Sequence, residues 1–283
     1  MRGEWTISYK GALFIFLHIL ALRALFSLTT GLIDDEAYHW SWTKDLMLSY
    51  YDHPGFVAWM GKLSTALFGD SLLGVRAFSF LFYSASIVIA WRLARDLFGD
   101  WSAHFTAFML LFTPLWGLGG YVYSPEPFFV FFWVSAAWVF WQGVRPDPDR
   151  WSPQKTWLWL GILMGLGLNS KFIMALLAPG FGLFLLTQRQ YRCHLLSRWP
   201  WIGVLISILI CLPIFLWNID FDWPGFKYQF HDRHTDAAPS FNRWLQFLSA
   251  QVLFMTPVLF ALMVAAVVRA LKRWEQPHWR FIT

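Results

Sequence analysis

Eight apolar segments recur along the 283-residue chain, and they restrict its fold more than any other feature. A helix needs about 20 mostly apolar residues to cross about 30 Å of hydrocarbon. The segments cover residues 11–33, 72–94, 102–123, 127–143, 156–170, 171–188, 199–217 and 244–268. The first is long and interrupted by Arg23, which is unlike a cleaved signal peptide. The pattern therefore predicts an all-α, polytopic transmembrane bundle of about eight spans.

The composition agrees with a chain whose solvent is lipid. Hydrophobic residues make up 57% of the sequence and charged residues only 14%, with 20 Trp. A soluble domain of this length would need more charge to cover its surface, whereas Trp and Tyr favour the membrane interface. Lys and Arg are scattered, so no nucleic-acid partner is expected. Cys193 and Cys211 form no recognisable disulfide framework.

The distribution of basic residues predicts the orientation of the chain. With the N-terminus in the cytosol, 14 of the 22 Lys and Arg residues fall in inside segments and seven in outside segments. Cytosolic loops of membrane proteins carry this excess of Lys and Arg. Residues 34–71 and 218–243 then form two long outer loops. We therefore expect a multi-pass protein of the inner (plasma) membrane with its polar loops on the periplasmic or extracellular face.

The first outer loop begins with three consecutive acids, Asp34, Asp35 and Glu36, followed by Tyr38. One interpretation is helix capping, since an acid at the start of a helix accepts backbone N–H bonds. The other is catalysis, because a carboxylate beside an apolar face is partly desolvated and becomes a useful base. The residues alone favour neither interpretation.

The same loop contains LSYYDHPGFVAWM at 48–60, which is amphipathic and rich in aromatic residues. The pattern predicts a helix lying in the membrane interface. Asp52 and His53 precede Pro54, so capping is the simpler explanation for them. A polar patch under Trp and Tyr rings is equally suited to a sugar, which makes Tyr38, Asp52 and His53 candidate substrate-binding residues.

Two more charged residues lie in tight turns on the predicted outer face. Glu126 stands between two prolines, and Lys171 stands between two apolar runs with almost no loop. An ionisable group at membrane depth is costly and is a functional hypothesis by default, with snorkelling to the surface as the alternative. Lys171 is placed to meet a lipid phosphate, and Glu126 to meet a polar acceptor.

The second outer loop carries Lys227, His231, Arg233 and His234 among acids and aromatic residues. Arg suits phosphate because its planar guanidinium donates two parallel hydrogen bonds. The histidines lack a firm ligand spacing, so metal binding is the weaker interpretation and no metal residue is assigned. No cofactor is identified, and a requirement for a divalent metal stays open. A solvated polar loop is the simplest alternative.

Five motifs occur in an order that resembles the membrane glycosyltransferases of family 39, the bacterial relatives of dolichyl-phosphate-mannose protein mannosyltransferases, including aminoarabinose transferases that act on lipid A. The motifs are DEAYHW (35–40), SYYDHPGFVAW (49–59), SPEPFFVFF (124–132), GLGLNSKF (165–172) and PIFLWNIDFDWPGFKYQF (213–230). The first two are distinctive as a pair, and the others are informative in series.

The resemblance implies a GT-C fold, with amphipathic helices in the first outer loop, a polyprenyl-phosphate sugar as donor and inversion at the anomeric carbon. It implies that Asp35 is the general base, with Glu36 beside it in the same motif. Glu126 stands where the family usually has Asp and implies an acceptor-side role. Lys171 matches the basic residue near the donor phosphate. Arg233 is chosen as a second phosphate contact by its position in the loop.

The sequence departs from the family pattern at three points. His39 stands where Tyr is usual, and Gly55 stands where a second proline is common. Family members also continue with further helices. We therefore expect residues 1–283 to form one transmembrane glycosyltransferase domain that corresponds to the N-terminal, catalytic half of the family, with truncation at the C-terminus as one explanation of the length.

The predicted function is transfer of a sugar from a polyprenyl-phosphate donor to a hydroxyl of a lipid, glycan or protein acceptor, among membrane lipids. The alternative is a lipid-handling or transport protein without catalysis, in which the same cations hold a headgroup and the acids only cap helices. A transporter more often has repeat-related halves, and the sequence has no such symmetry.

Overall fold

The computed structural model describes residues 9–113, 119–234 and 240–281, and within them it contains helices and no strand. The N-terminal half comprises α1 (Tyr9–Ser27), α2 (Asp34–Trp42), α3 (Phe56–Phe68), α4 (Leu72–Phe98), α5 (Asp100–Phe112), α7 (Pro125–Val144) and α8 (Pro153–Ser170). The C-terminal half comprises η1 (Phe172–Leu176), α9 (Leu177–Thr187), η2 (Arg189–Tyr191), α10 (Cys193–Leu196), α11 (Arg198–Ile210), α12 (Leu212–Asp220), α13 (Pro224–Phe230), η3 (Asp232–His234), α14 (Phe241–Met255), α15 (Pro257–Lys272) and α16 (Pro277–Phe281). The prediction of an all-α fold is confirmed.

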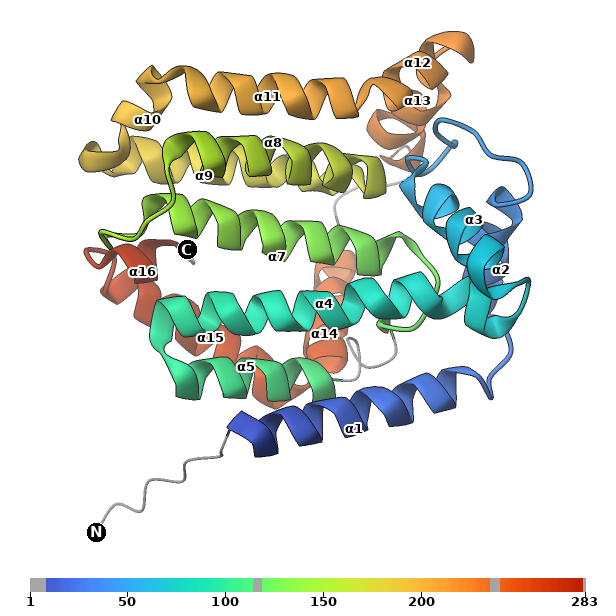
Figure 1. Cartoon of the computed structure of the whole chain (residues 1–283), viewed down its shortest axis with the longest axis horizontal. Helices are drawn as coiled ribbons and strands as arrows, with labels where there is room; N and C mark the ends of the chain where they lie inside the picture. The colour runs from blue at the N-terminus through green and yellow to red at the C-terminus, as the bar shows by residue number, and fades with distance from the viewer. Residues whose placement is uncertain (1–8, 114–118, 235–239, 282–283) are drawn as a thin grey trace.

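The long helices form a stack in which each packs on its neighbour (Figure 1). The order is α11, α8, α7, α4 and α5, and α1 contacts α4 and α5. The core lies along α7, where Phe128, Phe132 and Phe140 are at most 3% exposed. The inner helices α8, α7 and α4 each pack on two neighbours and so bury two faces, while their remaining apolar faces stay exposed, as is usual for a helix in contact with lipid.

Glycines permit the closest of these crossings, between α8 and α11. A Cβ atom on Gly161 would lie 2.4 Å from the carbonyl oxygen of Gly203, and one on Gly165 would lie 2.7 Å from Ile210. Small residues four apart on a helix let two backbones approach, as is common in membrane bundles. This crossing sets the position of the end of α8, where Lys171 follows.

The number of predicted spans is not confirmed by the helices. Within the described residues, α4 and α7 are long and apolar enough to cross a membrane, and the number rises to five if each of three bent pairs is one span. The segment 199–217 is divided by a bend of 42° between α11 and α12, and 244–268 by a bend of 105° between α14 and α15. Proline at the start of α12 and of α15 accounts for both breaks.

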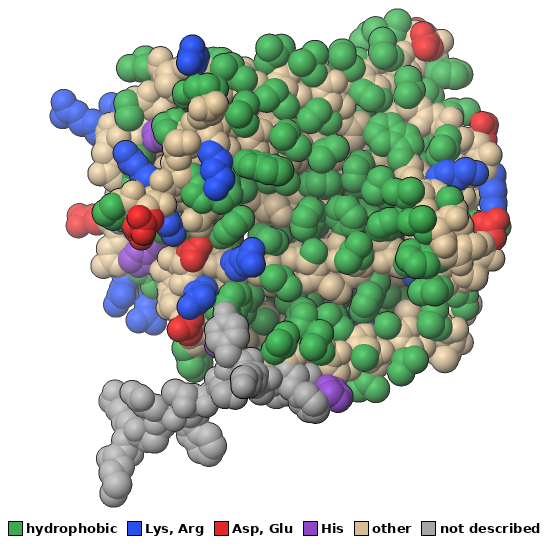
Figure 2. Space-filling model, in the orientation of Figure 1, with side chains coloured by type: hydrophobic (Ala, Val, Ile, Leu, Met, Phe, Trp, Pro, Cys, Tyr) green, Lys and Arg blue, Asp and Glu red, His purple; other side chains and the backbone are tan. Residues whose placement is uncertain are grey.

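The middle of the molecule is covered by apolar side chains, and charged side chains gather at the two ends of the helices (Figure 2). The first outer loop, with α2 and α3, and the second, with α12 and α13, meet at one end (Figure 1). Two contacts join them: the Tyr51 hydroxyl donates to Asp232 over 3.2 Å, and Gln229 Nε2 donates to the Asp52 carbonyl over 2.7 Å. Both predicted outer loops therefore share one face.

The segment 48–60 is only partly helical, which corrects the prediction of one interfacial helix there. Residues 48–55 form a turn closed by a bridge between Ser49 and Pro54, and α3 begins at Phe56. The Tyr50 ring stacks on Trp42 at 4.1 Å, and its hydroxyl donates to the Trp42 carbonyl over 3.1 Å. This anchor holds the turn against α2 and brings Asp52 and His53 over the end of the bundle.

Candidate active site

Helix α2 starts with the three acids, and Glu36 performs the capping. Ile33 is the N-cap residue, and its N–H donates to Glu36 Oε2 over 3.1 Å. The capping interpretation is therefore right for the third acid of the run. Asp34 and Asp35 occupy the first turn of α2 with exposed side chains, where the helix dipole favours their charge.

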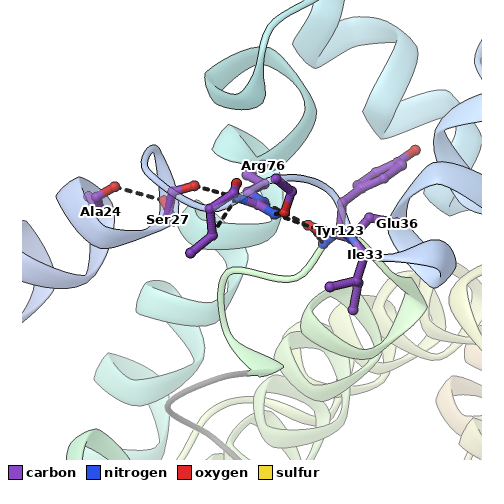
Figure 3. A network of polar contacts seen from close by, with 8 residues as sticks. Ala24, Ser27, Ile33, Glu36, Arg76 and Tyr123 are labelled. Carbon is purple, nitrogen blue, oxygen red and sulfur yellow. Dashed lines mark hydrogen bonds and ion pairs between the residues drawn. The ribbon is translucent and has the colours of Figure 1, made fainter.

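Glu36 lies at the centre of a buried polar network (Figure 3). It is fully buried, and Arg76 of α4 donates Nε to its Oε1 over 2.7 Å and Nη2 to its Oε2. The Tyr123 N–H also donates to Oε1, over 2.9 Å. With Ile33, four donors satisfy this carboxylate, so it has no exposed oxygen with which to touch a substrate. The predicted catalytic role of Glu36 is therefore replaced by a structural one.

Arg76 extends the network to the chain between α1 and α2. Its Nη1 donates to the carbonyls of Ser27 and Thr30, the latter over 3.0 Å, and its Nη2 donates to the Gly31 carbonyl over 2.9 Å. A single guanidinium thereby fixes the start of α2 against α1, α4 and the segment before α7. The sequence pattern did not single out Arg76, although an arginine close to membrane depth is itself a signal.

Asp35 points away from this network. Its side chain is 58% exposed, and its Oδ1 lies 3.7 Å from Nδ1 of His39, whose own side chain is 3% exposed. His39 Nδ1 also contacts the Asp35 carbonyl oxygen at 2.8 Å. Asp35 therefore presents an accessible carboxylate one residue away from a buried ion pair.

Tyr38 and Asp52 meet across the first outer loop. The Tyr38 hydroxyl donates to Asp52 Oδ1 over 3.1 Å. Burial raises the pKa of Tyr38 to about 12, and the neighbouring charge of Asp52 adds to the shift. The Tyr38 ring packs edge-on against Trp42 at 5.0 Å. An aromatic ring beside a carboxylate is a suitable surface for a sugar, since the ring covers the apolar face and the carboxylate accepts hydroxyl groups.

Four separate segments come together around His53. Burial lowers the pKa of His53; the Asp52 carboxylate opposes this shift, Lys171 and His39 add to it, and Glu126 opposes it. These electrostatic neighbours come from α2, the 48–55 turn, the start of α7 and the end of α8. Five charged or polar residues that are up to 132 positions apart in the sequence therefore surround one site.

Lys171 and Glu126 form an ion pair between the end of α8 and the start of α7. The two side chains are 26% and 50% exposed. Lys171 is the C-cap residue of α8 and has an extended backbone, which turns its side chain out of the helix. Pro125 stands at the first position of α7 and Glu126 in its first turn, a favourable place for a carboxylate. The start of α7 therefore positions Glu126, and the end of α8 positions Lys171.

The second outer loop forms the remaining side of the site through α13. Asn218 is fully buried, and its Oδ1 accepts the Gly225 N–H over 3.0 Å, which fixes the start of α13. From this helix Tyr228 packs on Tyr51 at 4.7 Å, and Gln229 accepts from Arg233 Nη1 over 3.4 Å. Arg233 is exposed, and its hydrogen bond is to Gln229, which in turn donates to the Asp52 carbonyl; the structure does not bring Arg233 to Lys171.

The arrangement combines an exposed base, a cation, aromatic rings and hydrogen-bonding groups at one end of an apolar bundle. The buried atoms His39 Nε2 and His53 Nδ1 have no hydrogen-bond partner within the described part of the chain. In the same part, no three His, Cys, Asp or Glu side chains are grouped closely enough to bind a metal ion. Such a site can deprotonate a hydroxyl and balance the charge of a phosphate.

Comparison with known proteins identifies relatives over most of the chain. The family model described as dolichyl-phosphate-mannose-protein mannosyltransferase matches residues 52–217. Lipid A galacturonosyltransferase RgtD of Rhizobium johnstonii is 24% identical over 86% of this chain and 50% of its own length. An undecaprenyl phosphate-alpha-4-amino-4-deoxy-L-arabinose arabinosyl transferase of Pseudomonas fluorescens is 30% identical over 98% of this chain and 52% of its own length. The chain thus spans about half the length of these relatives.

Solved structures show the same fold. ArnT from Cupriavidus metallidurans bound to undecaprenyl phosphate superimposes with a TM-score of 0.76 at 17% identity, covering 97% of this chain and 53% of that one. The apo state of the same protein gives a TM-score of 0.75 at 18% identity. The predicted GT-C architecture is therefore confirmed.

Proposed function

Because the chain belongs to the dolichyl-phosphate-mannose-protein mannosyltransferase family, we propose that it is a membrane glycosyltransferase, or the catalytic part of one. The donor is a sugar linked to a polyprenyl phosphate, and the acceptor is a hydroxyl on a lipid, glycan or protein. Relatives named for undecaprenyl-phosphate-linked sugars and for lipid A support a lipid-linked donor and a lipid acceptor. The related structure with bound undecaprenyl phosphate supports the same donor chemistry.

The observation that carries this proposal is the placement of Asp35 and Lys171 on the same end of the bundle, with His53 between their segments. His39 contacts Asp35 and its ring lies 5.9 Å from the His53 ring, while Lys171 is an electrostatic neighbour of His53. A base and a phosphate-binding cation are the two groups that direct displacement at a sugar phosphate requires. If Asp35 only capped a helix and Lys171 only extended to the membrane surface, neither role would require the two residues to lie near the same histidine.

In the proposed mechanism the acceptor hydroxyl attacks the anomeric carbon from the face opposite the phosphate. The Asp35 carboxylate takes the hydroxyl proton as the new carbon–oxygen bond forms. The bond between the anomeric carbon and the phosphate oxygen breaks, and the polyprenyl phosphate leaves with the electron pair. Lys171, with Arg233 as a second contact, stabilises the charge that develops on the phosphate. The single displacement inverts the anomeric configuration.

Tyr38, Asp52 and His53 are proposed to bind the sugar, and Glu126 the acceptor. The hydroxyl of Tyr38 stays protonated at neutral pH because its pKa is about 12, so it acts as a hydrogen-bond donor. We further assign the site to the periplasmic or extracellular face of the inner membrane and the N-terminus to the cytosol. This orientation rests on the excess of Lys and Arg in the loops at the opposite end.

The change Asp35→Asn tests the proposal, because it removes the base and keeps the shape of the side chain. We expect transfer to fall by about 10²- to 10⁴-fold, the usual contribution of a positioned base. Asp34→Asn is the matched control: it neutralises the adjacent exposed carboxylate and is expected to leave transfer near wild type. Sugar transfer to acceptor is measured in membranes containing each variant, with thermal unfolding to verify folding.

A fully active Asp35→Asn variant would contradict the mechanism. Native mass spectrometry of the protein, purified in mild detergent from its own membrane, distinguishes the lipid-handling alternative. A bound polyprenyl-phosphate sugar that is lost in the double variant Lys171→Ala, Arg233→Ala supports transfer, and its mass identifies the class of sugar. Ordinary phospholipid that is unaffected by this variant supports the alternative.

A further inference from the structure

We propose that Glu126 occupies the place of the donor phosphate on Lys171 until the donor arrives, and that the phosphate then displaces it. This inference rests on the proposed function, in which Lys171 binds the donor phosphate. It adds a second role to Glu126: its carboxylate controls the cation of the donor site and becomes available to the acceptor only after the donor has bound.

The first support is the geometry of the ion pair. Lys171 Nζ contacts Glu126 Oε1, one of the two carboxylate oxygens, and the Glu126 side chain is half exposed. A carboxylate bound through one oxygen presents to the lysine what a phosphate oxygen would present: a negative charge and an acceptor. Both members of the pair are electrostatic neighbours of His53.

The second support is that Glu126 can leave at little cost. The Lys171 and Glu126 side chains are 26% and 50% exposed, so water reaches both partners, and a pair in contact with water contributes less to stability than a buried one. A phosphate offers the ammonium group several oxygens and a charge-assisted hydrogen bond, which is among the stronger kinds. The phosphate therefore competes successfully for Lys171. Glu36 provides the contrast, since four buried donors hold its carboxylate and no ligand could displace it.

The consequence is an order of binding. With the donor absent, Glu126 neutralises Lys171, and neither residue is available to a substrate. Once the phosphate engages Lys171, the carboxylate of Glu126 is repelled by it and turns toward the remaining polar side of the site. The acceptor then finds a free carboxylate only in the donor-loaded protein, so donor binding precedes acceptor binding.

Binding of undecaprenyl phosphate to the purified protein tests this inference. Wild type, Glu126→Gln, Lys171→Ala and the double variant are titrated in detergent. We expect Glu126→Gln to bind about two- to fivefold more tightly, since the competing carboxylate is lost. Lys171→Ala is expected to bind about tenfold or more weakly. In the Lys171→Ala background, Glu126→Gln is expected to have no further effect.

Asp70→Asn is the matched control. Asp70 forms an exposed ion pair with Lys44, over 2.6 Å, in the first outer loop, and neither residue touches the candidate site. Its neutralisation removes one negative charge from the same face, so any general electrostatic effect on phosphate binding appears in this variant as well. We expect its affinity to match wild type. Thermal unfolding of each variant verifies that the fold is kept.

The outcomes separate the inference from the function on which it rests. If Lys171→Ala binds as tightly as wild type, Lys171 does not bind the phosphate and both ideas fail. If Lys171→Ala weakens binding but Glu126→Gln is unchanged or weaker, the competition by Glu126 is wrong while the donor site stands. If Glu126→Gln tightens binding equally in the Lys171→Ala background or no more than Asp70→Asn, the effect is general charge and the inference is wrong.

Discussion

Two ion pairs lie at the same end of the bundle, one between α2 and α4 and one between α7 and the end of α8, and they differ in burial and in the number of contacts. The Glu36–Arg76 pair is buried, with side chains 0% and 3% exposed, and every carboxylate lone pair has a donor. The Lys171–Glu126 pair is partly exposed, with side chains 26% and 50% exposed, and is joined through one oxygen. Burial turns the first into part of the scaffold, whereas exposure leaves the second able to exchange partners. Two ion pairs between a carboxylate and a cation therefore have different roles: the buried pair holds the fold, and the exposed pair can change partners.

The difference also explains why neighbouring acids have different roles. Asp35 and Glu36 are consecutive, but a helix turns by about 100° per residue, so one points into the bundle and the other outward. The buried pair of Glu36 fixes the first turn of α2 and thereby holds the exposed carboxylate of Asp35 in place. Glu36 therefore makes the base of the site rigid, and the adjacent Asp35 presents an accessible carboxylate at its surface.

Breaking the buried pair should give the largest effect. Arg76→Ala leaves the Glu36 carboxylate buried without its cation, and we expect the free energy of unfolding to fall by about 3–5 kcal/mol. Arg76→Lys should recover only part of this, since an ammonium group cannot reproduce the forked contacts to Glu36 and to three carbonyls. Thermal unfolding in detergent measures both. A loss below about 1 kcal/mol for Arg76→Ala would show that the pair is not a scaffold.

The second prediction concerns the crossing that positions Lys171. A Cβ on Gly161 would lie 2.4 Å from a backbone oxygen of Gly203, which cannot move aside as a side chain can. Gly161→Ala should therefore separate α8 from α11 and cost about 1–3 kcal/mol of stability. Gly180→Ala in α9 is the control, since nothing lies within 4 Å of its Cβ position. It should be neutral or slightly stabilising, and equal melting temperatures for the two variants would contradict the prediction.

Breaking the exposed pair should have a smaller effect on stability. Lys171→Ala is expected to change the free energy of unfolding by less than about 1 kcal/mol, because a partly exposed pair is weak. The change should shrink further at high salt, as screening weakens exposed pairs. Lys44→Ala, which breaks the exposed pair with Asp70, should behave alike. A loss as large as that of Arg76→Ala would abolish the distinction between the two pairs.

The smallest expected effect is a dependence of stability on pH from His53, beside the exposed pair. Burial lowers the pKa of His53 in the folded protein, so the unfolded chain binds more protons at mildly acidic pH. The stability contributed by neutral His53 is therefore fully present above the unfolded pKa of about 6.5 and is lost as the pH falls through the folded pKa. Melting temperatures of wild type and His53→Gln between pH 8 and 5 measure this. Parallel curves would show that His53 is not responsible.

Several features of the site could be predicted from the sequence because they depend on local patterns. Apolar length identifies α4 and α7. The positions of Glu126 and Lys171 in tight turns, and of Asp52 in a long loop, between successive apolar runs indicate that the three share one face. The resemblance in five ordered motifs predicted the family and the fold, both of which the comparisons confirm. The assigned roles of the site residues stay predictions until the variants are measured.

Other features could not be predicted because they depend on contacts between distant segments. The burial of Glu36 beside the exposed Asp35 depends on donors from distant segments: Arg76, 40 positions after Glu36, and the Tyr123 N–H. The bends of 42° and 105° also divide segments that appear continuous by hydropathy, since hydropathy measures apolar length and not direction.

The sequence by itself determined that this chain is a helical membrane protein, and that its two long polar loops lie on one side. Apolar length and charge asymmetry carry that information because lipid penalises every unpaired polar group. Only the tertiary structure decided which charges are buried and which are exposed. Burial depends on the side chains that three or four distant helices bring to one point, and it makes the Glu36 pair permanent and leaves the Lys171 pair open to exchange.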